Sequence, residues 1–323
     1  MTVYTGRDIK VGIARESSGR GTPVAATYYI PRNDFSFEDK ANVVIDEQGY
    51  GVIEDSVDEK ITSKWAEGDL GGLVRSKAIG LLLYNALGSS SPTGASGSPS
   101  AGLYTHTITV SQSHEHPSIT ITVDDPTEGD RTFALAMLNT LEISAERNEF
   151  VTFSANMMAK SSTPSTATPS YVSETSFISP DVTAKFKPTL SGIGGKTNTV
   201  LKSATITIEK ELEKDDVLGK IDPENFLNKT LRVSIEMTKN YENTTFKDMY
   251  MTSSPTAMRL GIVSSSGSPI GLTVDLNQVK ITEWATEKGL DDLITETFTA
   301  KANFKLADSQ MIKALLVNDV ASY

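Results

Sequence analysis

The chain has 323 residues and no cysteine, which excludes disulfide bonds, thiolate zinc sites and iron–sulfur clusters. Aromatic residues are scarce, and the two tryptophans, Trp65 and Trp284, lie in opposite halves without a neighbouring aromatic row. The longest apolar runs, around Leu81–Leu83, are much shorter than the roughly 20 residues that span a bilayer. Near the N-terminus no basic stretch precedes an apolar one, so we expect neither a secretory signal nor a membrane partner.

Positive charge is also in deficit, because 41 acidic side chains outweigh 30 basic ones and give a formal net charge of −11. The basic residues form no cluster, and such a surface gains nothing from counterion release on nucleic acid. We therefore expect the surface to repel DNA rather than to bind it.

Alternation of polar and apolar residues with a period of two dominates the chain and predicts a mainly β fold. In the first half the pattern predicts strands at 35–45, 104–110, 118–123, 141–145 and 150–155. One helix is expected, with Ser76 as its cap, apolar residues at helical spacing from Ile79 to Leu87, and Gly88 as its end.

Two tracts interrupt these patterns. Residues 89–102 are rich in Ser, Gly, Pro and Ala, and they are too poor in apolar side chains to fold alone, which predicts a flexible surface loop. Residues 161–170 are rich in Ser, Thr and Pro and are the best candidate for a boundary between two domains.

The second half repeats the order of the first. We predict strands at 204–209, 231–237, 258–263, 272–276, 279–284 and 295–304, and a short helix at 244–251. By pattern, 119–123 matches 272–276 and 140–143 matches 280–283. We interpret this as a duplication: two similar β-sandwich or β-barrel domains, at 1–160 and 176–323, each with one flanking α-helix and joined by a linker at 161–175. The alternative is that any two sets of alternating strands look alike.

Two motifs invite a functional interpretation, and both are incomplete. The segment Gly192–Thr197 ends in Gly-Lys-Thr, but Leu190 occupies the position where a phosphate-binding loop requires its first glycine. His114 and His116 would share one face of a strand, but no third metal ligand can be named, and Pro117 indicates a turn. No catalytic motif is present, so we predict no enzyme activity, no cofactor and no metal.

Five segments taken together resemble one known family. They are Glu67–Val74, Ile79–Gly88, Tyr104–Ile121, Val200–Glu209 and Asn228–Glu242. In this order they are similar to the tail tube (major tail) proteins of long-tailed bacteriophages, and the likeness covers most of the chain, although no single motif is specific.

The resemblance implies a structural protein of the virion, made in the cytoplasm of the bacterial host. Subunits of that family form rings, and the rings stack into a hollow tail tube through which DNA leaves the capsid. The expected partners are further copies of the chain and other tail proteins (tape measure, terminator and tip), whereas DNA passes without specific binding. The family has no catalytic residues to carry over.

A tube subunit is expected to share sheet edges with its neighbours, and an acidic lumen would keep DNA mobile by repulsion. We expect the strands that precede the helix of each half to line the lumen or the assembly surface, with candidate residues Thr62, Lys64, Trp65, Glu67, Asp69, Arg232, Ser234 and Glu236. The loop at 89–102 either orders against the next ring or remains a plain surface tract, and its candidate contact residues are Ser89, Thr93, Gly97 and Gly102.

Ring symmetry follows from the duplication. If a one-domain subunit needs six copies to close a sixfold ring, a two-domain chain needs three, so we predict homotrimeric rings with pseudo-sixfold symmetry. The alternatives are a β-rich tube or baseplate protein of a contractile injection device, a head decoration protein, and a carbohydrate-binding β-sandwich module. The last of these would require a row of exposed aromatic residues on one sheet face.

Overall fold

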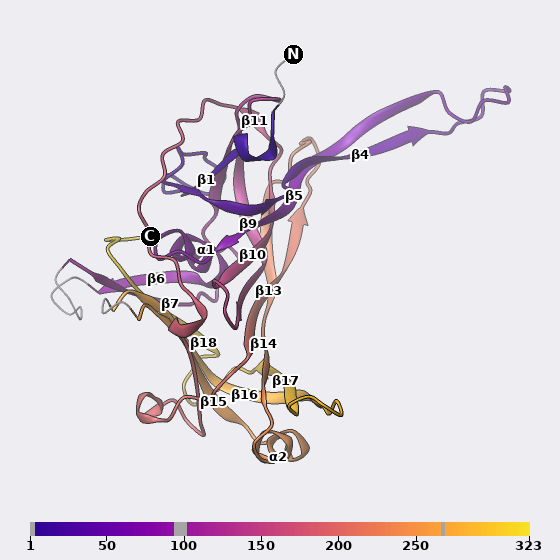
Figure 1. The fold of residues 1–323 in the computed structure, drawn as a ribbon. Helices are drawn as coiled ribbons and strands as arrows, with labels where there is room; N and C mark the ends of the chain where they lie inside the picture. Colours follow the sequence, from indigo (N-terminus) through magenta and orange to yellow (C-terminus); the bar gives the residue numbers. More distant parts are fainter. Residues whose placement is uncertain (1–3, 94–101, 266–268) are drawn as a thin grey trace.

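The computed structural model describes residues 4–93, 102–265 and 269–323. Almost all of the regular structure is antiparallel β-sheet, which confirms the predicted mainly β fold with one helix in each half. Figure 1 shows the first half of the chain above the second, with the two halves sharing a long twisted sheet. None of the described helices is long and apolar enough to cross a membrane.

The described part of the first half contains ten strands and one α-helix. Their bounds are β1 (Lys10–Arg15), β2 (Tyr28–Ile30), β3 (Arg32–Phe35), β4 (Glu38–Asp46), β5 (Asp58–Leu73), α1 (Ala78–Leu87), β6 (Gly88–Thr93), β7 (Tyr104–Val110), β8 (Ile119–Asp124), β9 (Arg131–Glu146) and β10 (Thr152–Ala159).

The connecting segment and the second half, as far as they are described, contain eight strands and one α-helix. Their bounds are β11 (Thr163–Pro164), β12 (Val182–Lys187), β13 (Ser203–Asp215), β14 (Asn225–Asn240), α2 (Thr245–Thr252), β15 (Thr256–Val263), β16 (Gly271–Glu287), β17 (Thr295–Ala302) and β18 (Ile312–Asn318).

The two halves share one order of strand pairing. In the first half, hydrogen-bonded neighbours run β1–β8–β9–β10–β5–β4. In the second half they run β12–β15–β16–β17–β14–β13. In both halves a long hairpin (β4–β5 or β13–β14) directly precedes the helix.

The irregularities of the ladders also coincide. The ladder between β9 and β10 shifts register at Asn139, and that between β16 and β17 shifts at Thr282. When these two ladders are aligned on their bulges, the pair Glu38–Glu67 corresponds to the pair Thr207–Ser234. In each of the hairpins β4–β5 and β13–β14, the pairing register then shifts about four residues after this pair. A β-bulge adds a residue to one strand and alters the twist, so coincident bulges show that the halves match in register as well as in order.

Four details of the predicted elements need correction. The match of 119–123 with 272–276 is wrong, because pairing order aligns β8 with β15, whereas 140–143 and 280–283 do lie in the aligned strands β9 and β16 but three residues out of register. The two strands predicted at 272–276 and 279–284 form one strand, β16. The residue at the helix cap position is Lys77, not Ser76. The first five residues of the predicted loop at 89–102 lie in β6, which pairs with β7; residues 94–101 lie outside the described part of the chain.

Helix α1 is buried along its whole length inside the first half. The backbone N–H groups of Lys77 and Ala78 both donate to the Glu174 carboxylate at 2.9 Å, so a residue from the connecting segment caps the helix. Such a carboxylate satisfies otherwise free N–H groups and complements the helix dipole. Gly88 ends the helix as predicted, in the left-handed conformation with φ 90°.

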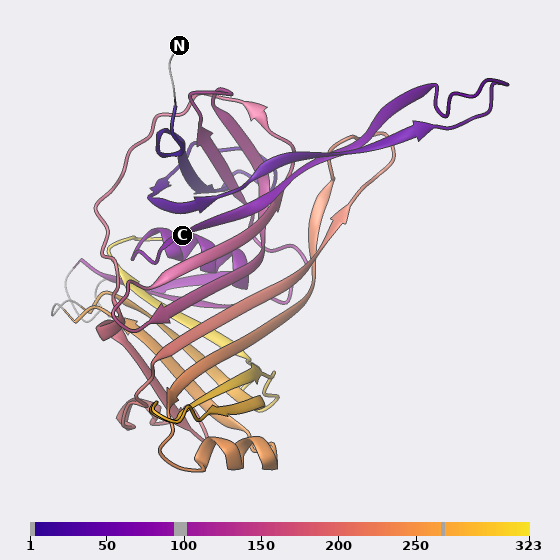
Figure 2. The same ribbon diagram turned by 45° about the vertical axis from the view of Figure 1, so that its right-hand side comes forward.

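The hairpin β4–β5 projects far from the body beyond its bulge, and we call residues 43–61 the arm (Figure 2). Its apolar side chains are unusually exposed: Val43, Val44, Ile45, Tyr50, Val52, Ile53, Val57 and Ile61. An isolated two-stranded ribbon with this many uncovered apolar residues is typical of a segment that is covered by a partner.

Gly68 sets the crossing between the start of β4 and strand β5. Its φ is +156°, and a Cβ there would lie 2.5 Å from both the Cα of Phe37 and the carbonyl oxygen of Ser36. A Gly68→Ala variant is therefore expected to lose about 2–3 kcal/mol of unfolding free energy, measured by urea denaturation. Gly71→Ala is the matched control, because its Cβ would meet Asp34 at an ordinary 3.4 Å. Equal losses in both variants would contradict the expectation.

Candidate functional site

Eight neighbouring strands form one continuous sheet with two different faces. The order is β4–β5–β10–β9–β13–β14–β17–β16, and alternate residues of each strand point into the core. In β9 the buried residues are Leu141, Ile143 and Ala145, and in β14 they are Val233, Ile235 and Met237. The residues between them point to the opposite face, which we call the polar face.

Cross-strand rows on the polar face are made almost entirely of polar side chains. One row holds Asp69, Asn156, Thr140, Glu209 and Arg232, each paired with the next across the sheet. The Asn156 amide donates to Asp69 at 2.9 Å, and Arg232 approaches Glu209 at 3.8 Å. In the neighbouring rows the hydroxyl groups join the strands as well, since those of Ser144 and Thr205 lie 3.0 Å apart, as do those of Thr238 and Thr297.

Negative charge predominates on this face. Its acidic residues include Glu38, Glu67, Asp69, Glu142, Glu146, Glu209, Glu211, Glu213, Glu236, Glu283 and Glu287, and its basic residues include Lys40, Lys229, Arg232, Lys280 and Lys301. Lys229 is held by Glu213 at 2.7 Å, and this hydrogen bond raises the pKa of the ammonium group. Part of the positive charge is thus already neutralised within the sheet, and the field of the face is acidic.

Six of the eight strand residues predicted for the lumen lie on the polar face. They are Trp65, Glu67, Asp69, Arg232, Ser234 and Glu236, and the sheet places the first three at positions equivalent to the last three. Thr62 is the extra residue of the β4–β5 bulge and accepts a hydrogen bond from Asn42 at 3.1 Å. Lys64 alternates to the opposite face. The bulge at Thr62 has no local signal, whereas the period of two alone places Lys64 on the face opposite its neighbour Trp65.

The far end of the β13–β14 hairpin folds over part of the polar face of the first half. Phe226 is fully buried there against Leu135 and Met137, with Met158 and Leu212 at the margin. Further along, the N–H of Lys64 donates to the carbonyl of Ile221 at 2.9 Å, and the Lys214 ammonium lies 3.9 Å from the ring centre of Trp65. Trp65 is therefore covered by the second half of the same chain.

The candidate loop residues are less informative. Ser89 and Thr93 are exposed and lie in β6, opposite Thr109 and Thr105 of β7. Gly102 has φ +84°, which glycine adopts readily, and Gly97 lies outside the described residues. Their proposed contact with a further ring remains a prediction.

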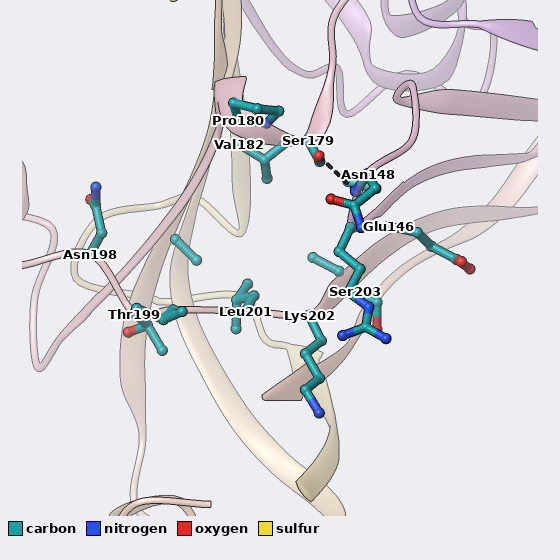
Figure 3. A pocket seen from close by; sticks show the side chains of 15 residues that line it. Glu146, Asn148, Ser179, Pro180, Val182, Asn198, Thr199, Leu201, Lys202 and Ser203 are labelled. Atoms are coloured by element: carbon teal, nitrogen blue, oxygen red, sulfur yellow. Dashed lines mark hydrogen bonds between the residues drawn. The ribbon is translucent and has the colours of Figure 1, made fainter. Parts of the chain in front are cut away.

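A cavity of about 360 Å³ lies where the β9–β10 turn of the first half meets the segment leading into β13 (Figure 3). Figure 3 shows the Asn148 backbone N–H donating to the Ser179 hydroxyl at one side of the cavity, a hydrogen bond of 3.0 Å. The charged residues among those that line it are Glu146, Arg147 and Lys202. The cavity therefore lies at the end of the β9–β13 ladder at which Glu146 pairs with Ser203.

The histidine motif lies in the loop between β7 and β8, and its ring nitrogens contact backbone carbonyls. His114 Nδ1 lies 2.7 Å from the Asn228 oxygen, and both ring nitrogens of His116 lie within 3.2 Å of such oxygens. Burial, with a contribution from nearby Lys210, lowers the pKa of His116 to about 4. Among the described residues, no group of three His, Asp or Glu side chains is placed to hold a metal.

Sequence reasoning missed two parts of the sheet that no described strand covers. One is the arm, whose signal was the apolar run Val43–Ile45 and the apolar pair Val52–Ile53 in an otherwise acidic stretch. The other is the outer edge of β16 beyond its bulge, for which the sequence carries no local signal.

Comparison with known proteins adds one finding. A family model described as phage tail tube protein matches residues 6–302, which is nearly the whole chain. No curated protein matches the chain.

Proposed function

The chain belongs to the phage tail tube protein family, and from this we propose that it forms homotrimeric rings that stack into the tube that delivers DNA. Membership of the family makes it a structural protein of the phage tail. The proposed role is architectural, requires no catalytic residue or cofactor, and takes place in the virion after synthesis in the host cytoplasm. Other tail components would contact the ends of the tube.

The observation that carries the proposal is the eight-stranded sheet with one polar, acidic face and, at each side, an edge that no further described strand pairs: β4 at one side and Glu283–Glu287 of β16 at the other. Three such sheets joined edge to edge would close a barrel of about 24 strands, about 50 Å across at a strand spacing of about 4.8 Å and a tilt of about 40°. Such a barrel is wide enough to pass a DNA duplex. An acidic lumen repels the duplex, so DNA would slide without binding.

We also propose that residues 1–160 and 176–323 are two copies of one tail-tube domain. The repeated pairing order and the coincident bulges support this division. The segment between them runs along the first half: Ser162 donates to Asp39 at 2.8 Å, and Thr163 pairs with Thr132. The hairpin β6–β7, which projects from the side of the body (Figure 1), is our candidate for contact with the next ring.

The test is electron microscopy of the purified protein at high concentration. We expect hollow tubes whose rings have threefold symmetry, with six similar densities around the lumen. Threefold averaging should sharpen the two halves of each chain as distinct, and sixfold averaging should blur them. Rings of six whole chains, or the absence of tubes under all conditions, would contradict the proposal.

A further inference from the structure

The two halves of the chain meet through one pair of strands. Residues Thr140–Glu146 of β9 pair with Ser203–Glu209 of β13, and this ladder makes the sheet continuous from one half to the other. Because the halves are equivalent, each half has one strand edge of the β9 type and one of the β13 type. In the contact inside the chain, the first half uses its β9-type edge and the second half uses its β13-type edge.

The remaining two edges of these types are unpaired in the described chain. Beyond its bulge, β16 is the counterpart of the β9 edge, and over Glu283–Glu287 it pairs with β17 alone among the described strands. Strand β4 is the counterpart of β13 and pairs only with β5 in the described chain. One end of the eight-stranded sheet thus carries an unpaired β9-type edge, on β16, and the other end carries an unpaired β13-type edge, on β4.

We propose, on the basis of the proposed ring, that the contact between chains is a copy of the contact inside the chain. The β16 edge of one subunit pairs antiparallel with the start of β4 of the next subunit. The occupant of each free edge is therefore a second copy of this chain, and the ring closes because the contact is head to tail.

The bulges fix the register of this contact. Asn139 and Thr282 are equivalent, so Glu142 corresponds to Ala285. Thr207 and Glu38 lie opposite the equivalent residues Ser234 and Glu67. Inside the chain Glu142 is paired with Thr207. Between chains, Ala285 is therefore paired with Glu38.

The same register brings complementary groups together. It places Glu283 opposite Lys40, which is an ion pair across the strands, and both residues belong to the polar face. It also places Glu287 opposite Ser36, the counterpart of the hydrogen-bonded pair Ser144 and Thr205. Opposite charges facing each other in an antiparallel pair stabilise it, and like charges destabilise it.

The equivalence of the two halves also predicts where the arm docks on the neighbouring subunit. It corresponds to the end of the β13–β14 hairpin, in which Phe226 is buried against Met137 and Met158. The counterpart of Phe226 is Glu59, and the counterparts of the two methionines are Lys280 and Lys301. An apolar contact inside the chain thus becomes an acid–base contact between chains.

The apolar tip of the arm also has a position to occupy. Inside the chain, the tip of β13–β14 contacts Lys64, whose counterpart is Leu231. Leu231 lines a cavity of about 350 Å³ together with Met311 and Phe304, and Phe304 is 52% exposed. This cavity lies where the tip of the neighbour's arm, with Val52 and Ile53, is expected to reach.

Paired cysteines test the register in a protein that has no cysteine of its own. The Ala285→Cys/Glu38→Cys double variant is expected to form covalent dimers and trimers on oxidation of assembled tubes, seen by non-reducing electrophoresis. Directly opposite residues have the Cβ separation that a disulfide requires. The Glu142→Cys/Thr207→Cys variant is the positive control, because its disulfide closes inside one chain.

Two further variants separate this contact from others. Ala285→Cys/Asn42→Cys places the second thiol four residues along the strand, about 13 Å away, and should give no crosslink. Glu283→Lys or Lys40→Glu alone should raise the concentration needed for assembly by roughly tenfold, and the double reversal should restore it. Both positions are exposed or half-exposed, so the unfolding temperature of the free subunit should not change.

The outcomes also separate this inference from the proposed function. Tubes that assemble from the Ala285→Cys/Glu38→Cys variant without any crosslink would overturn the register and leave the tail tube intact. Preferential crosslinking through Asn42 would overturn it as well. If no variant and no wild-type protein assembles, the proposed function fails, and the contact between chains fails with it.

Discussion

A Lys210→Met variant is expected to unfold at a higher temperature than the wild-type protein at pH 7, with a gain of about 2–4 kcal/mol in unfolding free energy. Lys210 lies in β13 and is 1% exposed. Its ammonium donates to the carbonyl oxygen of Asn85 in helix α1 at 2.8 Å, and the charged group that acts on it is the Arg20 guanidinium rather than a described carboxylate. A buried charge without a counter-charge is costly.

The pH dependence of this gain follows from the pKa of Lys210. Burial lowers that pKa from 10.5 to about 7, and the nearby Arg20 guanidinium acts in the same direction. Between these two values the unfolded chain binds more protons than the folded one, so stability rises with pH across that window. Below about pH 7 the penalty is present in full. The variant is therefore expected to lose the rise in stability between pH 7 and about 9.5.

Measurement should stay inside that window. Above it the buried tyrosines, Tyr323 among them, have raised pKa values, so their ionisation favours the unfolded state. At pH values below the ordinary histidine pKa of 6.5, the depressed pKa of His116 lowers stability for a separate reason. Urea denaturation at about pH 7 and about pH 9 gives the two points needed.

The control is Lys229→Met, whose ammonium is exposed and paired with Glu213, and its stability should change little at either pH. A Lys210→Met protein that is less stable than wild type at both pH values would contradict the expectation. It would mean that the hydrogen bond to the C-terminal end of α1, worth about 1–3 kcal/mol when charged, outweighs the desolvation penalty.

The sequence predicts the elements that depend on local chemistry. The helix 79–87 and its glycine end are correct because burial on all sides and a left-handed cap leave a local signature. The strand β6 was missed because its Ser and Pro residues are polar, and it forms only through backbone pairing with β7. Strand β16 was divided because Asn277 and Gln278 resemble a turn, yet the Asn277 amide is buried and donates to Asp308 at 2.9 Å.

The candidate site likewise has a part that local sequence predicts and a part that it does not. The polar face was predictable in part, because the alternation in 65–69 and 232–236 identifies one face of each strand. The junction of β9 with β13 was not predictable, since it joins residues far apart in the sequence, such as Ser144 and Thr205, whose contact is set by the two halves packing together. A long-range pairing of this kind leaves no trace in any single window of sequence.

The arm gives the second large effect. A Val43→Lys variant is expected to remain folded and to lose tube assembly, with the required protein concentration raised by at least about 100-fold. Val43 is the counterpart of Leu212, which packs at the margin of the Phe226 cluster in the contact inside the chain. A further ammonium group placed there would be buried against the neighbouring subunit beside Lys280 and Lys301, the counterparts of Met137 and Met158, so like charges would face each other.

Val44→Lys is the matched control because Val44 alternates to the other face of the same strand. Its counterpart, Glu213, is exposed and charged, so a charged side chain is tolerated at that position of the hairpin. Both valines are similarly exposed in the free chain, at 47% and 52%, so neither change should alter the unfolding temperature of the subunit. Sedimentation of tubes over a concentration series separates the two variants. Equal loss of assembly in both variants would mean that the neighbouring subunit covers both faces of the arm, which contradicts the contact seen inside the chain. No loss of assembly in either variant would mean that the arm does not dock at this position of the neighbouring subunit.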